Sequence, residues 1–282
     1  MMKTVFISGL GLIGSSLARV ISKNGNYVIG FDPKIDNTNF MLRNKFINAS
    51  LDFNTAAIQA DVIILAGPVN VIIEQINKLN QLNLKPGTII SDVGSTKASI
   101  MKAASVFEAK QIYFIGGHPM AGSQLTGSQA GKLSLFKNAT YFMVPSESAK
   151  DKVCELEEIL AKSEANFKTI SPNKHDQIVG NISHLPHAIV FTLMNTIDQT
   201  IGKELQDINV GGGLLSTTRI AAADAEMWNA IFQDNSKNIL HSINEFETEL
   251  KALKKMIKNN DTNKLKHFMQ HSQMIRKQIE KK

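Results

Sequence analysis

The sequence is poor in cysteine, proline and aromatic residues. Its 282 residues include one cysteine, 7 prolines and 6% aromatic side chains. Because a lone cysteine, Cys154, cannot form a disulfide within the chain, the composition favours a reducing compartment, and we expect a cytoplasmic protein. A hydrophobic content of 43% with only 20% charged residues excludes a disordered or fibrous chain. The composition is that of an ordinary folded enzyme or binding protein.

Long apolar runs and an even spread of charge are also missing. No run approaches the roughly 18 apolar residues that a membrane span requires, so we expect no membrane partner. The net charge of +6 comes from the end of the chain, because residues 251–282 hold ten Lys or Arg against two acidic residues. These cations alternate with apolar residues at helical spacing. The pattern favours a solvated helix face over a nucleic-acid-binding surface, and we expect no nucleic-acid partner.

The first 171 residues alternate strand-like and helical patterns. Short apolar or β-branched runs occupy residues 4–8, 27–31, 61–66, 87–92, 112–117, 139–145 and 167–171. Helical patterns cover residues 13–24, 69–82, 95–105 and 148–163. This alternation is typical of an α/β fold with a Rossmann-type, doubly wound parallel sheet and right-handed crossovers. We therefore predict a dinucleotide-binding domain over residues 1–171.

The character of the chain changes after Pro172, where strand-like runs disappear. Helical periodicity covers residues 173–202, 217–232 and 236–258, with a glycine-rich loop expected at 209–216. This pattern predicts an all-α C-terminal domain over residues 172–282. Because a helical domain offers a natural association surface, we expect a homodimer formed through it.

The segment GLGLIG follows the first predicted strand and opens the first predicted helix. Its glycines allow a tight turn, a close approach of the backbone to a pyrophosphate, and close packing of helix on strand. Asp32 ends the second strand, where a carboxylate can bind ribose hydroxyls and repel a 2′-phosphate, so we expect NAD. The spacing favours this interpretation over a signal peptide or a purely structural turn. The expected cofactor contacts are Gly9, Leu10, Gly11, Leu12, Ile13, Gly14, Asp32, Pro68 and Ser95.

Two polar turns follow neighbouring strands of the predicted sheet. In SDVGSTK, residues 91–97, Ser95 or Thr96 could cap the next helix, or Ser95 could touch substrate and cofactor. In GGHPMAGSQ, residues 116–124, His118 stands in the turn at a carboxyl end. A histidine in a turn is often structural. A neutral imidazole with a pKa near 6.5 nevertheless suits proton removal from an alcohol, so we interpret His118 as a general base.

Three histidines occupy the first helical pattern of the second domain. His184 and His187 are three residues apart and share a face, and Pro186 between them should kink the helix. A metal site formed by His175, His184 and His187 is not expected, because no Cys, Asp or Glu completes the set at ligand spacing.

The segment STTRIAAADAEMWNAIFQDN, residues 216–235, follows the glycine-rich loop. Arg219 is either a solvated charge or a bidentate clamp for a carboxylate facing the cofactor. Trp228 is most simply a core residue, and Asn235 a helix cap or a hydrogen-bond donor between domains.

Together these segments resemble the prephenate/arogenate dehydrogenase family of tyrosine biosynthesis. The resemblance rests on GLGLIGSSLA, Asp32, DVGSTK, GGHPMAGS, the HD pair at 175–176, SHLPHA and TTRIAAADAEMWNAIFQDN, in the expected order over nearly the whole chain. It implies a stand-alone prephenate dehydrogenase. Hydride passes from the ring carbon bearing the hydroxyl to NAD, His118 accepts the hydroxyl proton, and loss of CO2 gives 4-hydroxyphenylpyruvate. With Ser95 positioning the hydroxyl, the implied substrate contacts are Arg219, His187, Gln124, Ser183, His184 and Trp228.

One departure from the family bears on the substrate. Several relatives have an acidic residue at the position of Gln124, where it could pair with the ammonium group of arogenate. A neutral amide lacks that charge, so we expect prephenate rather than arogenate as the substrate. A β-hydroxyacid-type dehydrogenase and a non-enzymatic NAD-responsive regulator are the alternatives, and neither requires a histidine at position 118.

Overall fold

The computed structural model describes residues 2–122 and 125–280, which form two compact units, Met1–Asn235 and Ser236–Lys282. Gln124, the residue on which the substrate prediction depends, lies outside the described residues. None of the described helices is long and apolar enough to cross a membrane.

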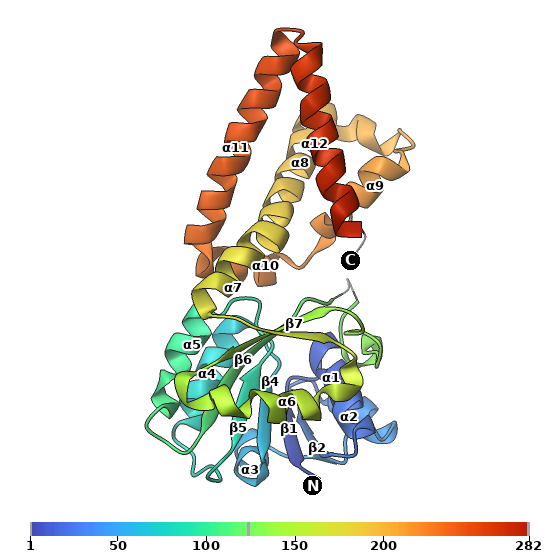
Figure 1. Ribbon diagram of the computed structural model, residues 1–282. Helices are drawn as coiled ribbons and strands as arrows, with labels where there is room; N and C mark the ends of the chain where they lie inside the picture. The colour runs from blue at the N-terminus through green and yellow to red at the C-terminus, as the bar shows by residue number, and fades with distance from the viewer. Residues whose placement is uncertain (1, 123–124, 281–282) are drawn as a thin grey trace. The chain divides into compact units, whose positions relative to one another are not determined.

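The first unit contains an eight-stranded sheet with the order β3-β2-β1-β4-β5-β6-β7-β8 (Figure 1). The strands are β1 Thr4–Ser8, β2 Tyr27–Phe31, β3 Ala49–Ser50, β4 Val62–Leu65, β5 Ile89–Asp92, β6 Tyr113–Pro119, β7 Thr140–Pro145 and β8 Asn166–Thr169. The strand order reverses at β1, which pairs with both β2 and β4. This arrangement confirms the predicted Rossmann-type sheet and places its topological switch point at the carboxyl ends of β1 and β4, where such folds bind ligands.

Helices cover both faces of the sheet and continue beyond it. Their bounds are α1 Leu12–Lys23, α2 Ile35–Arg43, α3 Phe53–Gln59, α4 Val69–Leu79, α5 Ala98–Ala104, α6 Val153–Ile159, α7 Pro172–Val179, α8 Leu185–Ile201, α9 Gly212–Thr218, α10 Ala225–Asp234, α11 Ser236–Lys258 and α12 Thr262–Glu280. After β8 the described chain is helical, as the loss of strand-like runs predicts.

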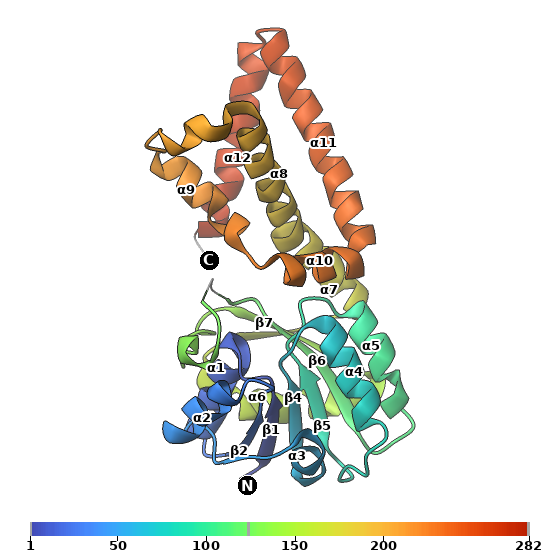
Figure 2. The same ribbon diagram turned by 180° about the vertical axis from the view of Figure 1, so that it is seen from behind.

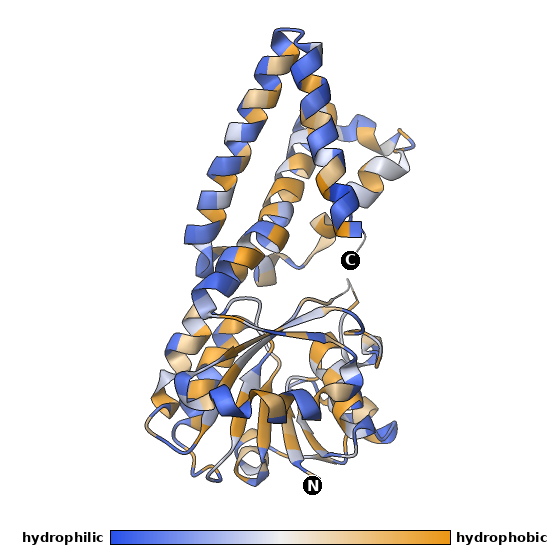
Figure 3. Ribbon diagram, in the orientation of Figure 1, coloured by the Kyte–Doolittle hydropathy of each residue, from blue (hydrophilic) through white to orange (hydrophobic). Residues whose placement is uncertain are grey.

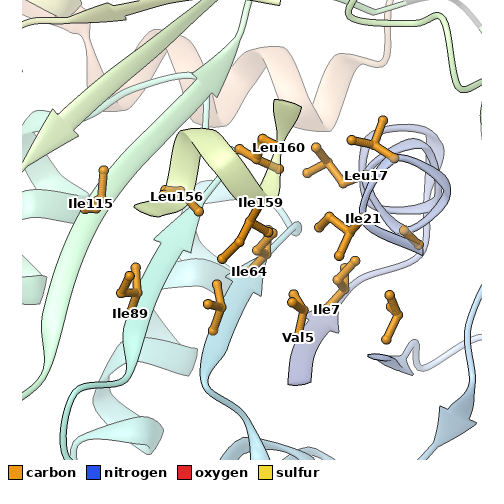
Figure 4. Close-up of a cluster of buried hydrophobic side chains, with 14 of the residues drawn as sticks. Val5, Ile7, Leu17, Ile21, Ile64, Ile89, Ile115, Leu156, Ile159 and Leu160 are labelled. Carbon is orange, nitrogen blue, oxygen red and sulfur yellow. The ribbon is translucent and has the colours of Figure 1, made fainter. Parts of the chain in front are cut away.

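Alternation along the strands divides the core into two layers. Val5 and Ile7 of β1 point to one face, where they pack with Leu17 and Ile21 of α1 and with α6 (Figure 4). Phe6, between them, points to the opposite face and packs with residues of α3, α4 and α5. Figures 1 and 2 show these two groups of helices on opposite sides of the sheet. Both faces are buried, which explains why the parallel strands are continuously apolar.

The sheet differs from the prediction at one edge. β7 runs antiparallel to β6, and β8 is parallel to β7, so the added edge is not a continuation of the parallel sheet. Pairing with β7 extends β6 to Pro119, and His118 stands opposite Phe142 within the ladder. The prediction that His118 lies in a turn is therefore wrong: hydrogen bonding to a neighbouring strand fixes its backbone.

The helical segment after Pro172 also differs in detail. The interruption expected at Pro186 takes the form of a π-helical turn, Gly180–His184, and Pro186 stands in the first turn of α8. Proline fits there because its missing amide has no partner in the first turn of a helix. The loop predicted at residues 209–216 is wrong in part, because α9 begins at Gly212, with Gly211 as its N-cap.

The second unit is a helical hairpin of α11 and α12. Apolar side chains recur along α11 at helical spacing between polar ones, as its alternating colours show (Figure 3). Leu250 and Ile257 of α11 are 51% and 57% exposed in the single chain. The hairpin therefore presents apolar surface to its surroundings.

The glycine-rich turn provides a test of the packing. A Cβ at Gly14 would lie 1.9 Å from the carbonyl oxygen of Gly9, whereas a Cβ at Gly11 would meet no atom within 4 Å. We expect Gly14→Ala to lower the free energy of unfolding by about 1–3 kcal/mol in urea denaturation, because α1 must move away from β1. Gly11→Ala is the matched control and should stay within about 1 kcal/mol of the wild type. Equal losses in the two variants would contradict this account.

Candidate active site

The turn between β1 and α1 has the geometry of a phosphate-binding loop. Gly9 has a φ of +98°, which favours glycine, and a Cβ there would lie 2.6 Å from the carbonyl oxygen of Ala66. Gly11 is the N-cap of α1, so no side chain at that position satisfies the first amides of the helix. With open space around Gly11, those amides can receive an anion.

Asp32 lies beside this turn at the end of β2. Its Oδ2 accepts a hydrogen bond from the amide of Leu10 at 2.7 Å, and its Oδ1 accepts one from the amide of Lys34 at 2.8 Å. The carboxylate thus joins the glycine turn to the chain that follows β2. An open helix N-terminus with a carboxylate at the next strand fits a dinucleotide, with phosphates at the amides and a ribose at the acid.

A buried ion pair links the turn after β5 to strand β6. Lys97 Nζ donates a hydrogen bond to Asp92 Oδ2, and both side chains are 0% exposed. Asp92 also accepts hydrogen bonds from the amides of Gly94 at 2.7 Å and Gly117 at 3.1 Å. Burial raises the pKa of Asp92 and lowers the pKa of Lys97, and in each case the partner's charge opposes burial. The pair fixes the Ser95 turn against the strand that carries His118.

The N-terminus of α5 is capped by a distant residue. Asp176 of α7 accepts hydrogen bonds from the amides of Lys97 at 2.7 Å and Ala98 at 2.8 Å. The sequence suggests Ser95 or Thr96 as the cap, but Thr96 Oγ1 instead donates to Asp234 Oδ2. That prediction is wrong, because the orphaned amides are satisfied by a carboxylate that only folding brings near.

His118 is joined to Asp176 through a second histidine. His118 Nδ1 lies 2.8 Å from His175 Nε2, and His175 Nδ1 lies 2.8 Å from Asp176 Oδ1. His175 is fully buried, and its ring meets Phe142 edge-on at 5.3 Å between centroids. His118 is half-buried at the end of β6. Three titratable side chains therefore form one hydrogen-bonded series ending at the sheet edge.

The surroundings keep the His118 imidazole neutral. Burial lowers its pKa well below 6.5, and the nearby His175, Lys97 and His184 lower it further. Its pKa is therefore not the unperturbed value expected from the sequence. A neutral imidazole can accept a proton at neutral pH, so the direction of the shift suits a base.

A second group of side chains joins α7, α8 and α10. Asn235 Nδ2 donates to the carbonyl oxygen of Asp176 at 2.8 Å and lies 3.0 Å from His184 Nδ1. The His184 ring meets Trp228 edge-on at 5.8 Å, and burial lowers the pKa of His184 to about 4. The His187 ring stacks on Trp228 at 3.6 Å between centroids, so the two histidines do share a face. This face is continuous with the His118 series.

His187 is held by the helix before it. Its Nδ1 lies 2.9 Å from the carbonyl oxygen of Ser183, which identifies Nδ1 as the protonated nitrogen. Burial lowers the pKa of His187, and the charge of Arg219 acts in the same direction. Arg219 begins a 3₁₀ turn, Arg219–Ala222, and its side chain is exposed. Trp228 is buried, and its Nε1 has no hydrogen-bond partner among the described residues.

The remaining residues named from the sequence lie around this region. Ser95 is half-buried in the turn between β5 and α5, and Pro68 is exposed as the N-cap of α4. Leu10 is buried, whereas Leu12 and Ile13 are half-buried in the first turn of α1. Within the described ranges, no group of three or more His, Cys, Asp and Glu side chains could hold a metal ion.

Sequence reasoning missed four residues of the site. They are the buried pair, Asp92 and Lys97, and the two partners of His118, His175 and Asp176. The last lysine of SDVGSTK and the HD pair were visible as motif letters. Their roles were not, because the contacts of Lys97 with Asp176 and of His118 with His175 cross from one element of the fold to another.

Comparisons with known proteins agree with this geometry. The family model described as prephenate dehydrogenase, nucleotide-binding domain, matches residues 17–169, and the model described as its dimerization domain matches residues 171–271. Prephenate dehydrogenase of Lactococcus lactis subsp. cremoris is 35% identical over 282 residues, covering 99% of this chain and 78% of its own.

Two solved structures are similar over almost their whole length. Prephenate dehydrogenase from Aquifex aeolicus, in complex with hydroxyphenyl propionate and NAD+, has a TM-score of 0.90 at 26% identity, covering 99% of each chain. Synechocystis arogenate dehydrogenase has a TM-score of 0.84 at 27% identity, covering 98% of this chain and 99% of its own.

The fold and the site define a dinucleotide-dependent dehydrogenase with a histidine at the carboxyl edge of its sheet. The first family model alone spans more than half of the sequence. The chain belongs to the prephenate dehydrogenase family.

The buried ion pair gives a prediction about stability. Lys97→Met leaves the Asp92 carboxylate buried without its cation, and we expect a loss of about 3–5 kcal/mol in the free energy of unfolding, measured by urea denaturation. The double variant Asp92→Asn/Lys97→Met should recover part of that loss. Lys85→Met removes a cation from the exposed pair with Asp61, where Nζ and Oδ1 are 2.9 Å apart, and serves as the control. It should cost about 1 kcal/mol or less. A Lys97→Met loss as small as the control's would refute the assigned role.

Proposed function

We propose that this protein catalyses the NAD-dependent oxidative decarboxylation of prephenate to 4-hydroxyphenylpyruvate and CO2, with His118 as the general base. The observation that carries the proposal is the placement of His118. It lies at the carboxyl edge of the sheet, its Nδ1 is engaged by His175, and its Nε2 remains to accept a proton. Membership in the prephenate dehydrogenase family supports the choice of substrate.

The cofactor would be held by the glycine turn and the acid beside it. The amides that begin α1 would bind the pyrophosphate around Gly11, and Asp32 would bind the ribose hydroxyls. When bound, NAD+ supplies the acceptor for the hydride that leaves the ring carbon of prephenate. Ser95, in the turn after β5, would orient the reacting hydroxyl toward His118.

The substrate is a dianion, which requires a cationic or hydrogen-bonding clamp. Arg219 and His187 would bind a carboxylate or the pyruvyl side chain, and the charge of Arg219 is felt at His187. The unpartnered Nε1 of Trp228 offers one further donor on the same face. Departure of the hydride, removal of the hydroxyl proton by His118 and loss of CO2 together make the ring aromatic, so the protein mainly orients the substrate and polarises one bond.

Domain organisation and assembly follow from the same family. The two family models meet between residues 169 and 171, which supports a domain boundary near 171. The model matching residues 171–271 is described as a dimerization domain, and α11 exposes apolar side chains within that range. We therefore propose a homodimer formed through the helical region. A cytoplasmic setting fits the single cysteine.

Substrate choice tests the proposed function directly. NADH formation should show a kcat/KM for prephenate at least about tenfold above that for arogenate, because Gln124 offers no charge to an ammonium group. Gln124→Glu should narrow that ratio by raising kcat/KM for arogenate. Gln129→Glu, on the same segment but away from His118, is the matched control and should leave the ratio unchanged. A higher kcat/KM for arogenate in the wild type would make the protein an arogenate dehydrogenase.

The pH dependence tests His118. Because burial lowers the pKa of His118, the base stays neutral as the pH falls through 6.5. We expect log kcat/KM to remain flat through pH 6.5 and to fall only at lower pH. His118→Asn should lower kcat about 10²–10⁴-fold and remove this acid limb, with NAD binding retained in a fluorescence titration. Near-normal hydride transfer in His118→Asn would instead favour a β-hydroxyacid-type dehydrogenase.

A further inference from the structure

The hydrogen bonds behind His118 fix the position of every proton in the series. Asp176 accepts two backbone amides and His175 Nδ1. Burial raises its pKa, but the hydrogen bonds from His175, Ala98 and Lys97 outweigh burial and hold the pKa of Asp176 below its usual range. The ionised carboxylate can only accept, so His175 Nδ1 carries a proton.

The tautomer of His175 in turn fixes the tautomer of His118. A neutral His175 protonated at Nδ1 has a lone pair at Nε2, which therefore accepts a hydrogen bond from His118 Nδ1 at 2.8 Å. His118 then carries its proton at Nδ1 and its lone pair at Nε2. The buried series thus selects the tautomer that a base facing the substrate requires.

We propose that His175 and Asp176 are positioning residues that form a proton relay behind His118, an inference that rests on the proposed function. The substrate hydroxyl gives its proton to His118 Nε2 as its O–H bond breaks. The N–H bond at His118 Nδ1 then breaks, and a new one forms at His175 Nε2. His118 is again neutral, and the positive charge rests on His175 beside the Asp176 carboxylate. Once the hydride has gone to NAD+ and CO2 has left, the ring oxygen is a phenolate. The steps then reverse, and His118 Nε2 returns its proton to that oxygen, which completes 4-hydroxyphenylpyruvate.

The charges around the two rings favour this transfer. Burial disfavours an imidazolium at His118, and of the described residues His175, Lys97 and His184 disfavour it further. Burial lowers the pKa of His175 and Lys97 lowers it further, but the hydrogen bond to the Asp176 carboxylate and the charges of Asp176 and Asp92 act in the opposite direction and favour its imidazolium. A positive charge on His175 is therefore offset by the adjacent Asp176 carboxylate, whereas a positive charge on His118 is not.

The packing around His175 keeps water from replacing the relay. The side chain is 0% exposed, and Phe142 of β7 contacts its ring edge-on. Asp176 in turn is fixed by the amides of α5 and through its own carbonyl oxygen by Asn235. The series has two ends, the His118 Nε2 atom at the sheet edge and the carboxylate in the interior.

Histidine tautomers can be measured without any reaction. In the wild-type protein labelled with 15N-histidine, with and without NAD+, long-range 15N–1H NMR correlations at pH 7.5 distinguish Nδ1–H from Nε2–H rings. Assignment uses His118→Asn and His175→Gln. We expect both His118 and His175 to be Nδ1–H tautomers. An Nε2–H tautomer at either ring would overturn the proposal, because the series could not run toward Asp176.

A kinetic experiment separates a relay from simple positioning. In His175→Gln, the amide oxygen can accept the hydrogen bond from His118 Nδ1 but cannot take its proton. We expect kcat for prephenate to fall about 10²-fold, with KM and the Kd for NAD+ within about twofold of the wild type. The proton inventory of kcat in H2O/D2O mixtures, curved in the wild type because two protons move, should become linear. Unchanged kcat and curvature would overturn the relay.

Two further measurements keep the outcomes distinct. Ser99→Ala is the control, because it removes a 2.8 Å hydrogen bond to Asp234 that joins α5 to α10 outside the relay. This variant should keep the wild-type kcat and a curved proton inventory. Circular dichroism and thermal melting check that His175→Gln is folded; if it is not, His118→Asn still assigns the His118 ring, and the tautomer of that ring in the wild type decides. A wild-type protein that reduces NAD+ with neither prephenate nor arogenate would end the proposed function, whereas the tautomers would remain a separate result.

Discussion

The carboxylate of Asp176 is the constraint on which the site depends. It accepts the two free amides at the start of α5 and the Nδ1 proton of His175, and so holds the turn after β5, the start of the helical region and the partner of His118 together. A carboxylate satisfies several donors at once because each oxygen has two acceptor directions. One buried charge therefore orders elements that lie nearly 80 positions apart in the chain.

The buried Asp92–Lys97 pair likewise holds separate segments of the chain together. Asp92 accepts the amide of Gly94 in the turn after β5 and the amide of Gly117 in β6, and Lys97 supplies the compensating charge. Burying two charges is costly, and a pair of apolar residues could fill the same space. An apolar pair could not hold the turn in a fixed relation to the strand, because it accepts no hydrogen bonds from backbone amides.

Much of the fold follows from local pattern. Continuous apolar runs, in which polar residues do not alternate with apolar ones, predict strands buried on both faces. The positions of Gly9, Gly14 and Asp32 predict the turn between β1 and α1 that the structure contains. The antiparallel β7 could not be predicted, because a strand's sequence carries no sign of its partner's direction. For the same reason the sequence does not show that His118 pairs with a neighbouring strand.

The sequence by itself determined the glycine turn after β1, the acidic residue after β2, and the presence of histidines near the end of β6 and in the helical region that follows the sheet. Only the tertiary structure decided what they contact. The sequence gives His175 no role and predicts His118 as an isolated base, but folding brings His118 Nδ1 within 2.8 Å of His175 Nε2 and places His175 against Asp176. Periodicity records which face of an element is buried, whereas a hydrogen bond between elements depends on the path of the whole chain.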